Sequence, residues 1–234
     1  MKLALAAALG LFVVAYLVPD ILMHRLGLWT VTGARPSVGS ISACALTFDD
    51  GPDPAFTPLI LDVLKRHGCR ATFFVVGEKA VLLPRVMERI AGEGHEIGLH
   101  GWDHRHPWLL DPITCRRNLR RAAAAVAPYV RPGISLKYRT PWGFWSLWAV
   151  LGSTGHQRVM WSLPGDDWKP KATPESVSAL VRSRIAGGAI VLLHDGARYS
   201  WKTASALGAI LQNMKEKGLR QVTVAELEEE PVAT

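Results

Sequence analysis

The strongest constraint on the fold is a regular alternation of short apolar segments and longer amphipathic ones, which begins near residue 41. The short segments are typical of buried strands and the longer ones of helices. Seven strand–helix pairs follow one another, which predicts a parallel sheet covered by helices, either open or closed into a barrel. The expected strands are residues 42–48, 71–76, 95–99, 136–139, 158–162, 189–193 and 220–222. The expected helices are residues 56–67, 81–91, 112–126, 144–151, 174–185, 200–217 and 224–229.

Reactive side chains follow five of these strands at the point where each strand ends. In chain order the groups are Asp49-Asp50, His100 with His104, Arg139, Asp166-Asp167-Trp168 and His194-Asp195. The C-terminal ends of parallel strands share one face of the sheet, and ligands bind there in α/β folds. Scattered surface residues have no reason to prefer that end, so the pattern predicts one functional site.

Two of these groups have the composition of a metal site. His100 and His104 are four residues apart, so on a helical turn their imidazoles would share a face. A carboxylate from Asp49-Asp50 would complete a His-His-Asp set that leaves positions open for water and substrate. The competing interpretations are turn-forming or helix-capping aspartates and ordinary packing histidines. Non-haem iron oxygenases use the same ligands, but those sites often take a histidine and the carboxylate from one segment of an all-β fold, so the α/β pattern favours a hydrolytic metal.

Five segments resemble, in order, the five motifs of the polysaccharide deacetylases, the NodB-homology group of carbohydrate esterase family 4. They are Thr47-Phe48-Asp49-Asp50-Gly51, His100-Gly101-Trp102-Asp103-His104, Arg139-Thr140-Pro141-Trp142-Gly143, Asp166-Asp167-Trp168 and Leu192-Leu193-His194-Asp195. The resemblance covers about residues 41–227. It implies a distorted (β/α) barrel of about seven parallel strands. It also implies the metal-dependent removal of N-acetyl groups from amino sugars.

The resemblance also implies a role for each matching residue. Asp50, His100 and His104 would hold the divalent metal, which is usually zinc in such enzymes, with cobalt or another divalent ion as the alternative. Asp49 would be the general base for the attacking water, and Arg139 would hold Asp49 in place.

The remaining roles concern the leaving group and the substrate. His194 would protonate the leaving amine, and Asp167 would tune the pKa of His194. The resemblance assigns substrate binding to Trp142, Gly143, Trp168 and Leu192, with the backbone N–H of Trp142 as an oxyanion donor. The chain departs from the family at Gly101, where Ser or Thr is usual, and at Trp142, where Tyr is usual. These departures bear on substrate choice and leave the ligand and acid–base groups intact.

The N-terminal segment predicts a second, smaller unit. Residues 1–18 are apolar apart from Lys2 and end at Pro19, so residues 1–23 are expected to form an uncleaved transmembrane or signal anchor. A cleaved signal peptide is the alternative, and it would leave a secreted protein. Residues 24–40 are expected to be a linker, residues 41–229 the catalytic domain and residues 230–234 a tail. The catalytic domain is expected on the extracytoplasmic side.

Composition limits the partners. The net charge is +7 and the pI is about 9.6, with the cations scattered along the chain, which suggests anionic lipid or cell-wall polymer. No nucleic-acid-binding motif is present, so no nucleic-acid partner is expected. The odd count of three cysteines argues against a disulfide framework, although one bridge stays open if the domain is exported. We expect a monomer.

Three functions follow from these observations. The first is a membrane-anchored, metal-dependent deacetylase of an N-acetylated glycan such as peptidoglycan, chitin oligomers or poly-N-acetylglucosamine. The second is a deacylase of a lipid-linked or small N-acylated sugar at the membrane. The third is a catalytically weak glycan-binding protein, against which the complete set of acid, base and ligand residues argues.

Overall fold

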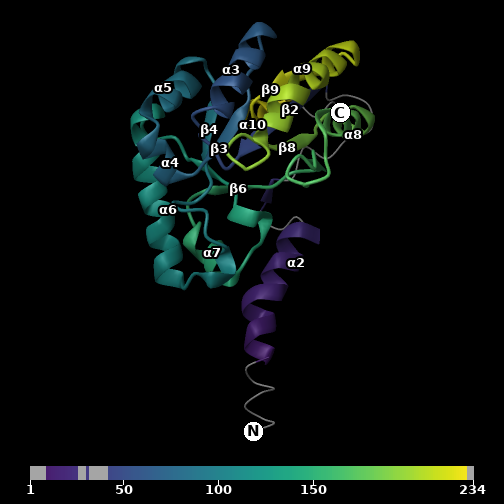
Figure 1. The fold of residues 1–234 in the computed structure, drawn as a ribbon. Coiled ribbons are helices and arrows are strands. Elements are labelled where there is room, and N and C mark those ends of the chain that lie inside the picture. The colour runs from purple at the N-terminus through teal and green to yellow at the C-terminus, as the bar shows by residue number, and fades with distance from the viewer. Residues whose placement is uncertain (1–8, 26–29, 32–41, 231–234) are drawn as a thin grey trace.

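The strands form one parallel sheet in the computed structural model, which describes residues 9–25, 30–31 and 42–230 (Figure 1). The strands are β1 (Thr30–Val31), β2 (Ala43–Asp49), β3 (Thr72–Val75), β4 (Glu96–Leu99), β5 (Lys137–Tyr138), β6 (Gln157–Val159), β7 (Leu163–Pro164), β8 (Ile190–His194) and β9 (Arg220–Val222). Their order is β1-β6-β5-β4-β3-β2-β8-β7, with β9 paired to β2. Every residue of β2 is buried, as its unbroken apolar run predicts for a central parallel strand.

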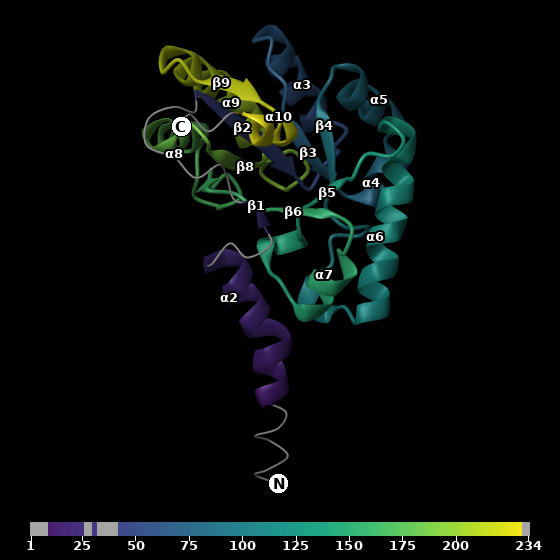
Figure 2. The same cartoon turned by 180° about the vertical axis from the view of Figure 1, so that it is seen from behind.

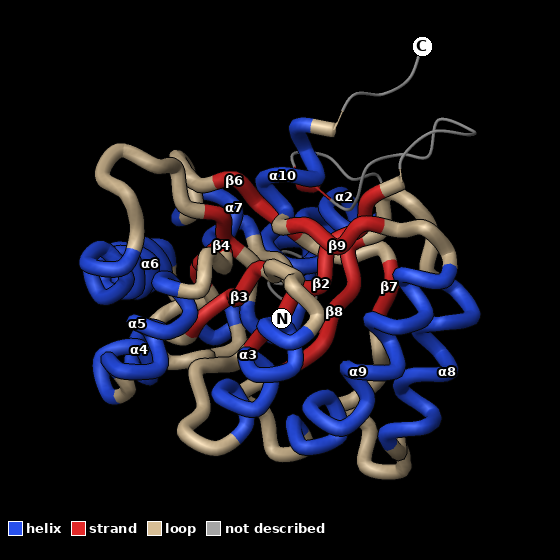
Figure 3. The backbone as a smooth tube through the Cα atoms, turned by 90° about the horizontal axis from the view of Figure 1, so that it is seen from above, coloured by secondary structure: helices blue, strands red, loops and turns tan. Residues whose placement is uncertain are grey.

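The sheet curls because of the path between β6 and β7. The sequence pattern predicts one strand at residues 158–162, but in the structure β6 ends at Val159 and β7 begins at Leu163, and these two short strands pair toward opposite ends of the sheet order. Four residue steps from Val159 to Leu163 reach at most about 14 Å, so the two ends of the sheet must lie close together. The result is the curled, barrel-like sheet seen from above in Figure 3.

Helices cover the outside of this curled sheet (Figures 1 and 2). They are α3 (Phe56–Arg66), α4 (Gly77–Leu82), α5 (Pro84–Gly92), α6 (Pro112–Val126), α7 (Leu147–Gly152), α8 (Pro174–Arg184), α9 (Ser200–Glu216) and α10 (Val224–Glu229). Residues 81–91, predicted as one helix, contain the end of α4 and most of α5, with a break at Leu83 (φ −125°, ψ 56°). The residue before a proline is pushed out of the helical region, and Pro84 follows directly.

The N-terminal segment is helical and packs against the domain with one side. Residues 9–12, η1 (Val13–Leu17) and α2 (Val18–Arg25) form a continuous helical rod that projects from the body of the molecule (Figure 1). The rings of Phe12 and Tyr16 lie 5.9 and 5.7 Å from that of Trp108, the middle residue of the 3-10 helix η2 (Pro107–Leu109). The Asp20 carboxylate accepts a 2.7 Å hydrogen bond from the backbone N–H of Trp145.

The division into anchor, linker and domain is therefore less sharp than the sequence suggests. Met23, assigned to the anchor, is fully buried in the main core. Thr30 and Val31, assigned to the linker, form β1 and pair with β6. Among the residues that the structure describes, no helix is both long enough and apolar enough to span a bilayer. The first eight residues of the predicted anchor and the predicted tail after Glu230 lie outside the described ranges.

All three cysteines are free. Cys44 and Cys115 are buried, and burial raises the pKa of their thiols to about 12 and about 11 respectively. Cys69 is partly exposed at the end of the turn that follows α3.

Candidate active site

The C-terminal strand ends bring the expected residues together. Asp49 is the last residue of β2, His194 is the last residue of β8, and the two are paired in register. His100 directly follows β4 and Arg139 directly follows β5. A cavity of about 520 Å³ opens at this face. The residues assigned to the site from sequence that line it are Asp49, Asp50, His100, His104, Trp142, Gly143, Trp168, Leu192 and His194.

Asp50 and the two histidines converge as metal ligands would. Asp50 Oδ1 lies 2.8 Å from His104 Nε2 and 3.3 Å from His100 Nε2, and one donor atom from each residue falls within 4.8 Å of the others. Asp50 adopts a left-handed backbone conformation (φ 72°), which is strained for a residue other than glycine. This conformation distinguishes Asp50 from its neighbour Asp49, which stays in the strand.

The histidines do not lie on a helical turn, so the expectation that their imidazoles share a helical face is wrong. Residues 100–106 are a loop, in which Gly101 (φ 77°) and His104 (φ 54°) both have left-handed backbone conformations. The side chain of Asn118 on α6 braces this loop by accepting from the N–H of Trp102 at 2.7 Å and donating to Asp103 at 2.8 Å. A glycine at 101 avoids both the strain and a contact of 3.1 Å between a Cβ and Asn118 Oδ1.

The donor set fits a divalent metal such as zinc. His100 Nδ1 is 2.9 Å from the carbonyl oxygen of Arg139, so an Nδ1–H tautomer donates there and leaves Nε2 as a lone-pair donor toward Asp50. Burial by itself raises the pKa of Asp50. Hydrogen bonds from His100 and His104 outweigh that effect and hold the pKa well below its usual value. An ionised carboxylate and two imidazoles are typical zinc ligands.

Asp49 is fixed by the most buried charge in the site. Arg139 is fully buried, and its Nη1 donates to Asp49 Oδ1 and to Thr47 Oγ1, each at 2.7 Å. Its other nitrogens donate to the carbonyl oxygens of Val159 and Met160, where the chain crosses between β6 and β7. Asp49 Oδ2 lies 3.8 Å from His100 Nε2. One oxygen of Asp49 is therefore tied to Arg139, while the other faces the cluster.

His194 is held by Asp167 in a similar way. Asp167 Oδ1 is 2.9 Å from His194 Nδ1, and Asp167 Oδ2 accepts from the His194 N–H at 2.8 Å and from Thr203 Oγ1 at 2.5 Å. Burial lowers the pKa of His194. The charge and hydrogen bond of Asp167, with Asp50 and Asp49, outweigh burial and raise the pKa to about 9. The raised pKa favours the protonated form of His194 at neutral pH.

Aromatic side chains form the walls of the cavity. Trp142 is 62% exposed, lies beside the His104 ring at 5.3 Å between centroids, and donates from Nε1 to the His104 carbonyl at 3.1 Å. Trp168 meets His194 edge-on at 5.4 Å. Trp161 both packs against the core and lines the cavity.

Sequence reasoning missed several contributors. Thr203 on α9 bonds to Asp167, and Lys79 on α4 donates to the carbonyl oxygens of Asp50 and Gly196 at 2.7 and 2.9 Å. Thr203 lies within a helix, so the strand-end pattern carries no signal for it, whereas Lys79 comes shortly after β3. Arg198 and Tyr199 also line the cavity, and their place shortly after β8 could have indicated them.

The fold and site together define a class: a parallel α/β barrel-like protein with a His-His-Asp cluster, an arginine-bound carboxylate and an aspartate-bound histidine around one cavity. The comparisons with known proteins identify the family within this class. The polysaccharide deacetylase family model matches residues 38–159. The chain belongs to the polysaccharide deacetylase family.

Individual relatives cover most of the chain. A peptidoglycan-N-acetylglucosamine deacetylase of Bacillus cereus is 34% identical over 187 residues, which cover 78% of this chain and 86% of the relative. A chitooligosaccharide deacetylase of Sinorhizobium fredii is 34% identical over 190 residues, which cover 74% and 86%. The crystal structure of a peptidoglycan N-acetylglucosamine deacetylase superposes with a TM-score of 0.78 at 28% identity and covers 88% of this chain and 95% of that one.

Proposed function

We propose that the protein is a metal-dependent hydrolase that removes N-acetyl groups from the amino sugars of a cell-wall or extracellular polysaccharide. The observation that carries the proposal is the pairing of two carboxylates at the end of β2. Asp50 turns toward His100 and His104, while Asp49 is bonded to Arg139 through one oxygen and faces the cluster with the other. A protein that only binds glycan does not need one carboxylate in a metal cluster and a second one held beside it by an arginine.

The proposed roles follow from the chemistry of amide hydrolysis. Asp50, His100 and His104 would hold the metal, which when bound supplies a Lewis acid that polarises the carbonyl and acidifies water. Asp49 would accept the proton of the attacking water as general base. Its contact with buried Arg139 keeps one carboxylate oxygen fixed, so that the other can face the attacking water.

The leaving amine needs a proton, and we assign that step to His194. Its pKa of about 9 keeps it protonated at neutral pH, and Asp167 holds its Nδ1 so that Nε2 carries the transferable proton. Trp168 and Leu192 would shape the acetyl pocket, and the backbone N–H of Trp142 and the turn at Gly143 would face the oxyanion.

The substrate class rests on the relatives and on the cavity wall. The relatives' names include deacetylases of peptidoglycan and of chitooligosaccharides. The exposed faces of Trp142 and Phe144 suit the C–H faces of sugar rings. We therefore propose peptidoglycan, chitin oligomers or poly-N-acetylglucosamine as substrates. A lipid-linked N-acylated sugar is the second candidate, favoured by the apolar helical rod beside the domain.

We further propose that the N-terminal segment attaches the catalytic domain to the membrane on its extracytoplasmic side. Seven large apolar side chains of the rod are exposed, a costly arrangement in water. They are Leu9, Leu11, Phe12, Val14, Leu17, Val18 and Ile21. The proposal keeps residues 41–229 as the deacetylase domain and residues 1–23 as the membrane-binding part.

The test is acetate release from a panel of N-acetylated glycans by the full-length chain. The assay is run as purified, after chelation, and after zinc or cobalt is restored. We expect release that stops with chelator and returns with metal. Failure to bind a divalent metal at all, together with no release from any substrate, would rule the proposal out.

A further inference from the structure

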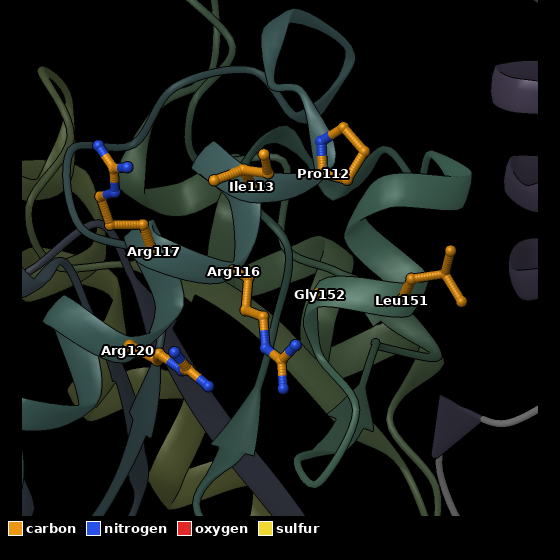
Figure 4. Close-up of a pocket in the computed structure, with 7 residues that line it drawn as sticks. All are labelled: Pro112, Ile113, Arg116, Arg117, Arg120, Leu151 and Gly152. Atoms are coloured by element: carbon orange, nitrogen blue, oxygen red, sulfur yellow. The ribbon is translucent and has the colours of Figure 1, made fainter.

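A second cavity of about 530 Å³ lies between α6 and α7 (Figure 4) and shares no lining residue with the catalytic cavity. Its lining combines arginines with exposed aliphatic side chains. We call it the arginine face, and it consists of Ile113, Arg116, Arg117, Arg120 and Leu151. None of its residues belongs to the proposed catalytic machinery, so it has a separate explanation.

The segment of the chain that contains this face is strongly basic. Residues 112–165 contain eight lysines and arginines and no aspartate or glutamate, against a net charge of +7 for the whole chain. The eight are Arg116, Arg117, Arg120, Arg121, Arg131, Lys137, Arg139 and Arg158. In this stretch the cations are clustered, which differs from the scattered distribution suggested by the sequence as a whole.

Several of these cations have protein partners, but those of the arginine face do not. Arg139 binds Asp49, Lys137 binds Glu228, and Arg121 lies over the ring of Trp102. Within the described part of the chain, no ion pair or hydrogen bond reaches the guanidinium groups of Arg116, Arg117 and Arg120. Three neighbouring guanidinium groups without a carboxylate repel one another unless an external anion neutralises them.

The nearest acid in the sequence does not neutralise them. Asp111 is the N-cap of α6, and its carboxylate accepts from the N–H groups of Ile113 and Thr114 at 2.9 and 3.0 Å and from the Thr114 hydroxyl. This engagement at the helix start leaves the guanidinium groups further along α6 without a partner.

Aliphatic side chains at the same place distinguish the kind of anion. Ile113 and Leu151 are 71% and 55% exposed, and Leu109, just before α6, is 79% exposed. A soluble phosphate polymer would pair with the arginines and gain nothing from these side chains. A bilayer surface offers both headgroup phosphates for guanidinium groups and an acyl boundary for aliphatic side chains.

The position of the face agrees with a bilayer. Helix α7 contacts both α6 and η1, so the rod, α7 and α6 are neighbours. Figures 1 and 2 show the N-terminal part of the rod extending beyond the ends of α6 and α7 on this side of the molecule. A membrane reached by the exposed apolar side chains of the rod would therefore lie beside the arginine face.

From these observations we propose that the arginine face binds the anionic headgroup surface of a phospholipid bilayer. The arginine face orients the domain on the membrane and takes no part in the reaction that the domain catalyses. Each arginine close to an anionic surface adds a roughly equal increment, so three together raise the preference for anionic over neutral lipid by roughly 100-fold.

The test measures binding of the full-length chain to vesicles by flotation. One set holds phosphatidylglycerol and phosphatidylcholine at about 3:7, and the other holds phosphatidylcholine alone. The triple variant R116Q/R117Q/R120Q is expected to lose roughly 100-fold in its preference for the anionic vesicles. The matched control R66Q/R182Q/R184Q removes the same charge from exposed arginines on α3 and α8 and is expected to keep that preference. Equal losses in the two variants, or no loss in the first, would overturn the proposal.

Two further measurements distinguish a bilayer from a soluble polyanion as the ligand, and lipid binding from catalysis. The variant I113S/L151S is expected to bind both vesicle types more weakly than the parent does. Its affinity for soluble polyphosphate is expected to equal that of the parent. If it binds vesicles like the parent while R116Q/R117Q/R120Q loses polyphosphate, the face is a site for soluble polyanions and the proposal fails. Acetate release from a soluble chitin oligomer by R116Q/R117Q/R120Q should equal that of the parent. A parent without this activity would count against the proposed function and leave the vesicle result intact.

Discussion

At the scale of single residues, adjacent aspartates have different partners because their backbones differ. Asp49 keeps the extended conformation of β2, while Asp50 turns to a positive φ of 72°. The sequence could predict that two carboxylates end a buried strand, because side-chain type and strand position are both visible there. It could not predict the loop geometry of His100 and His104, since the turn depends on Asn118 from a different element.

The first residue-scale prediction concerns the base. We expect Asp49→Asn to reduce kcat by ~10²–10⁴, the usual contribution of a positioned general base. Bound metal should stay stoichiometric, because Asp50, His100 and His104 are unchanged. Kinetics on a chitin oligomer and metal analysis check this. The exposed Asp62→Asn serves as the charge-matched control. An Asp49→Asn enzyme with full turnover would place the base elsewhere.

The second residue-scale prediction concerns pH. His194 has a pKa raised to about 9, so its acid form is present below that pH and is lost as the pH rises through it. Activity should therefore fall on the alkaline side near pH 9. In Asp167→Asn the raising charge is gone while burial still lowers the pKa, so the alkaline limb should move to lower pH. A pH–rate profile of kcat measures the shift. Thr203→Val, which removes only the hydroxyl that bonds to Asp167, should move the limb less, and an unmoved limb in Asp167→Asn would contradict the assignment.

At the scale of elements, the sequence predicts most of the helices and strands, and its errors occur where long-range geometry decides. Residues 158–162 carry the pattern of one strand, but β6 ends at Val159, β7 begins only at Leu163, and the two strands pair toward opposite ends of the sheet order. This division into two strands follows from the closure of the sheet, which local hydrophobicity cannot predict. The break at Leu83 was visible in principle, since Pro84 follows it.

Helix α8 offers an element-scale test of stability. Thr173 and Ser176 form a capping box, in which the Ser176 N–H donates to Thr173 Oγ1 at 3.2 Å and the Thr173 N–H donates to Ser176 Oγ at 2.9 Å. We expect Thr173→Ala to lower the free energy of unfolding by about 1 kcal/mol. Ser183→Ala, an exposed serine in the last turn of the same helix, should change it by less than about 0.5 kcal/mol. Urea unfolding measures both, and equal effects would show that the cap contributes nothing.

At the scale of the whole molecule, the site ties together strands that are distant in sequence. Asp50, His100 and His104 come from the loops after β2 and β4, and Arg139 joins β2 to the crossing between β6 and β7. A metal bound by these residues would bind the folded chain and not the unfolded one. The domain should therefore be more stable with metal than without it.

Thermal unfolding tests that statement. Zinc at a hundredfold excess over its dissociation constant stabilises the folded state by about 2.7 kcal/mol, which for a domain of this size raises Tm by roughly 5–10 °C. The double variant H100A/H104A should show no rise. A similar rise in this variant would mean that zinc binds at another place.

The contacts of the N-terminal rod carry a consequence for how much substrate the enzyme can reach. An enzyme on a loose tether sweeps a wide volume above its attachment point and meets glycan at many heights and angles. Here Asp20 is bonded to Trp145, and rings of the rod pack on Trp108, whose ring in turn contacts Phe144 at the mouth of the catalytic cavity. These contacts fix the height and tilt of the cavity above whatever surface holds the rod. An enzyme held in this way would modify one layer of the polymer, and the contacts between the rod and the domain would set the thickness of that layer.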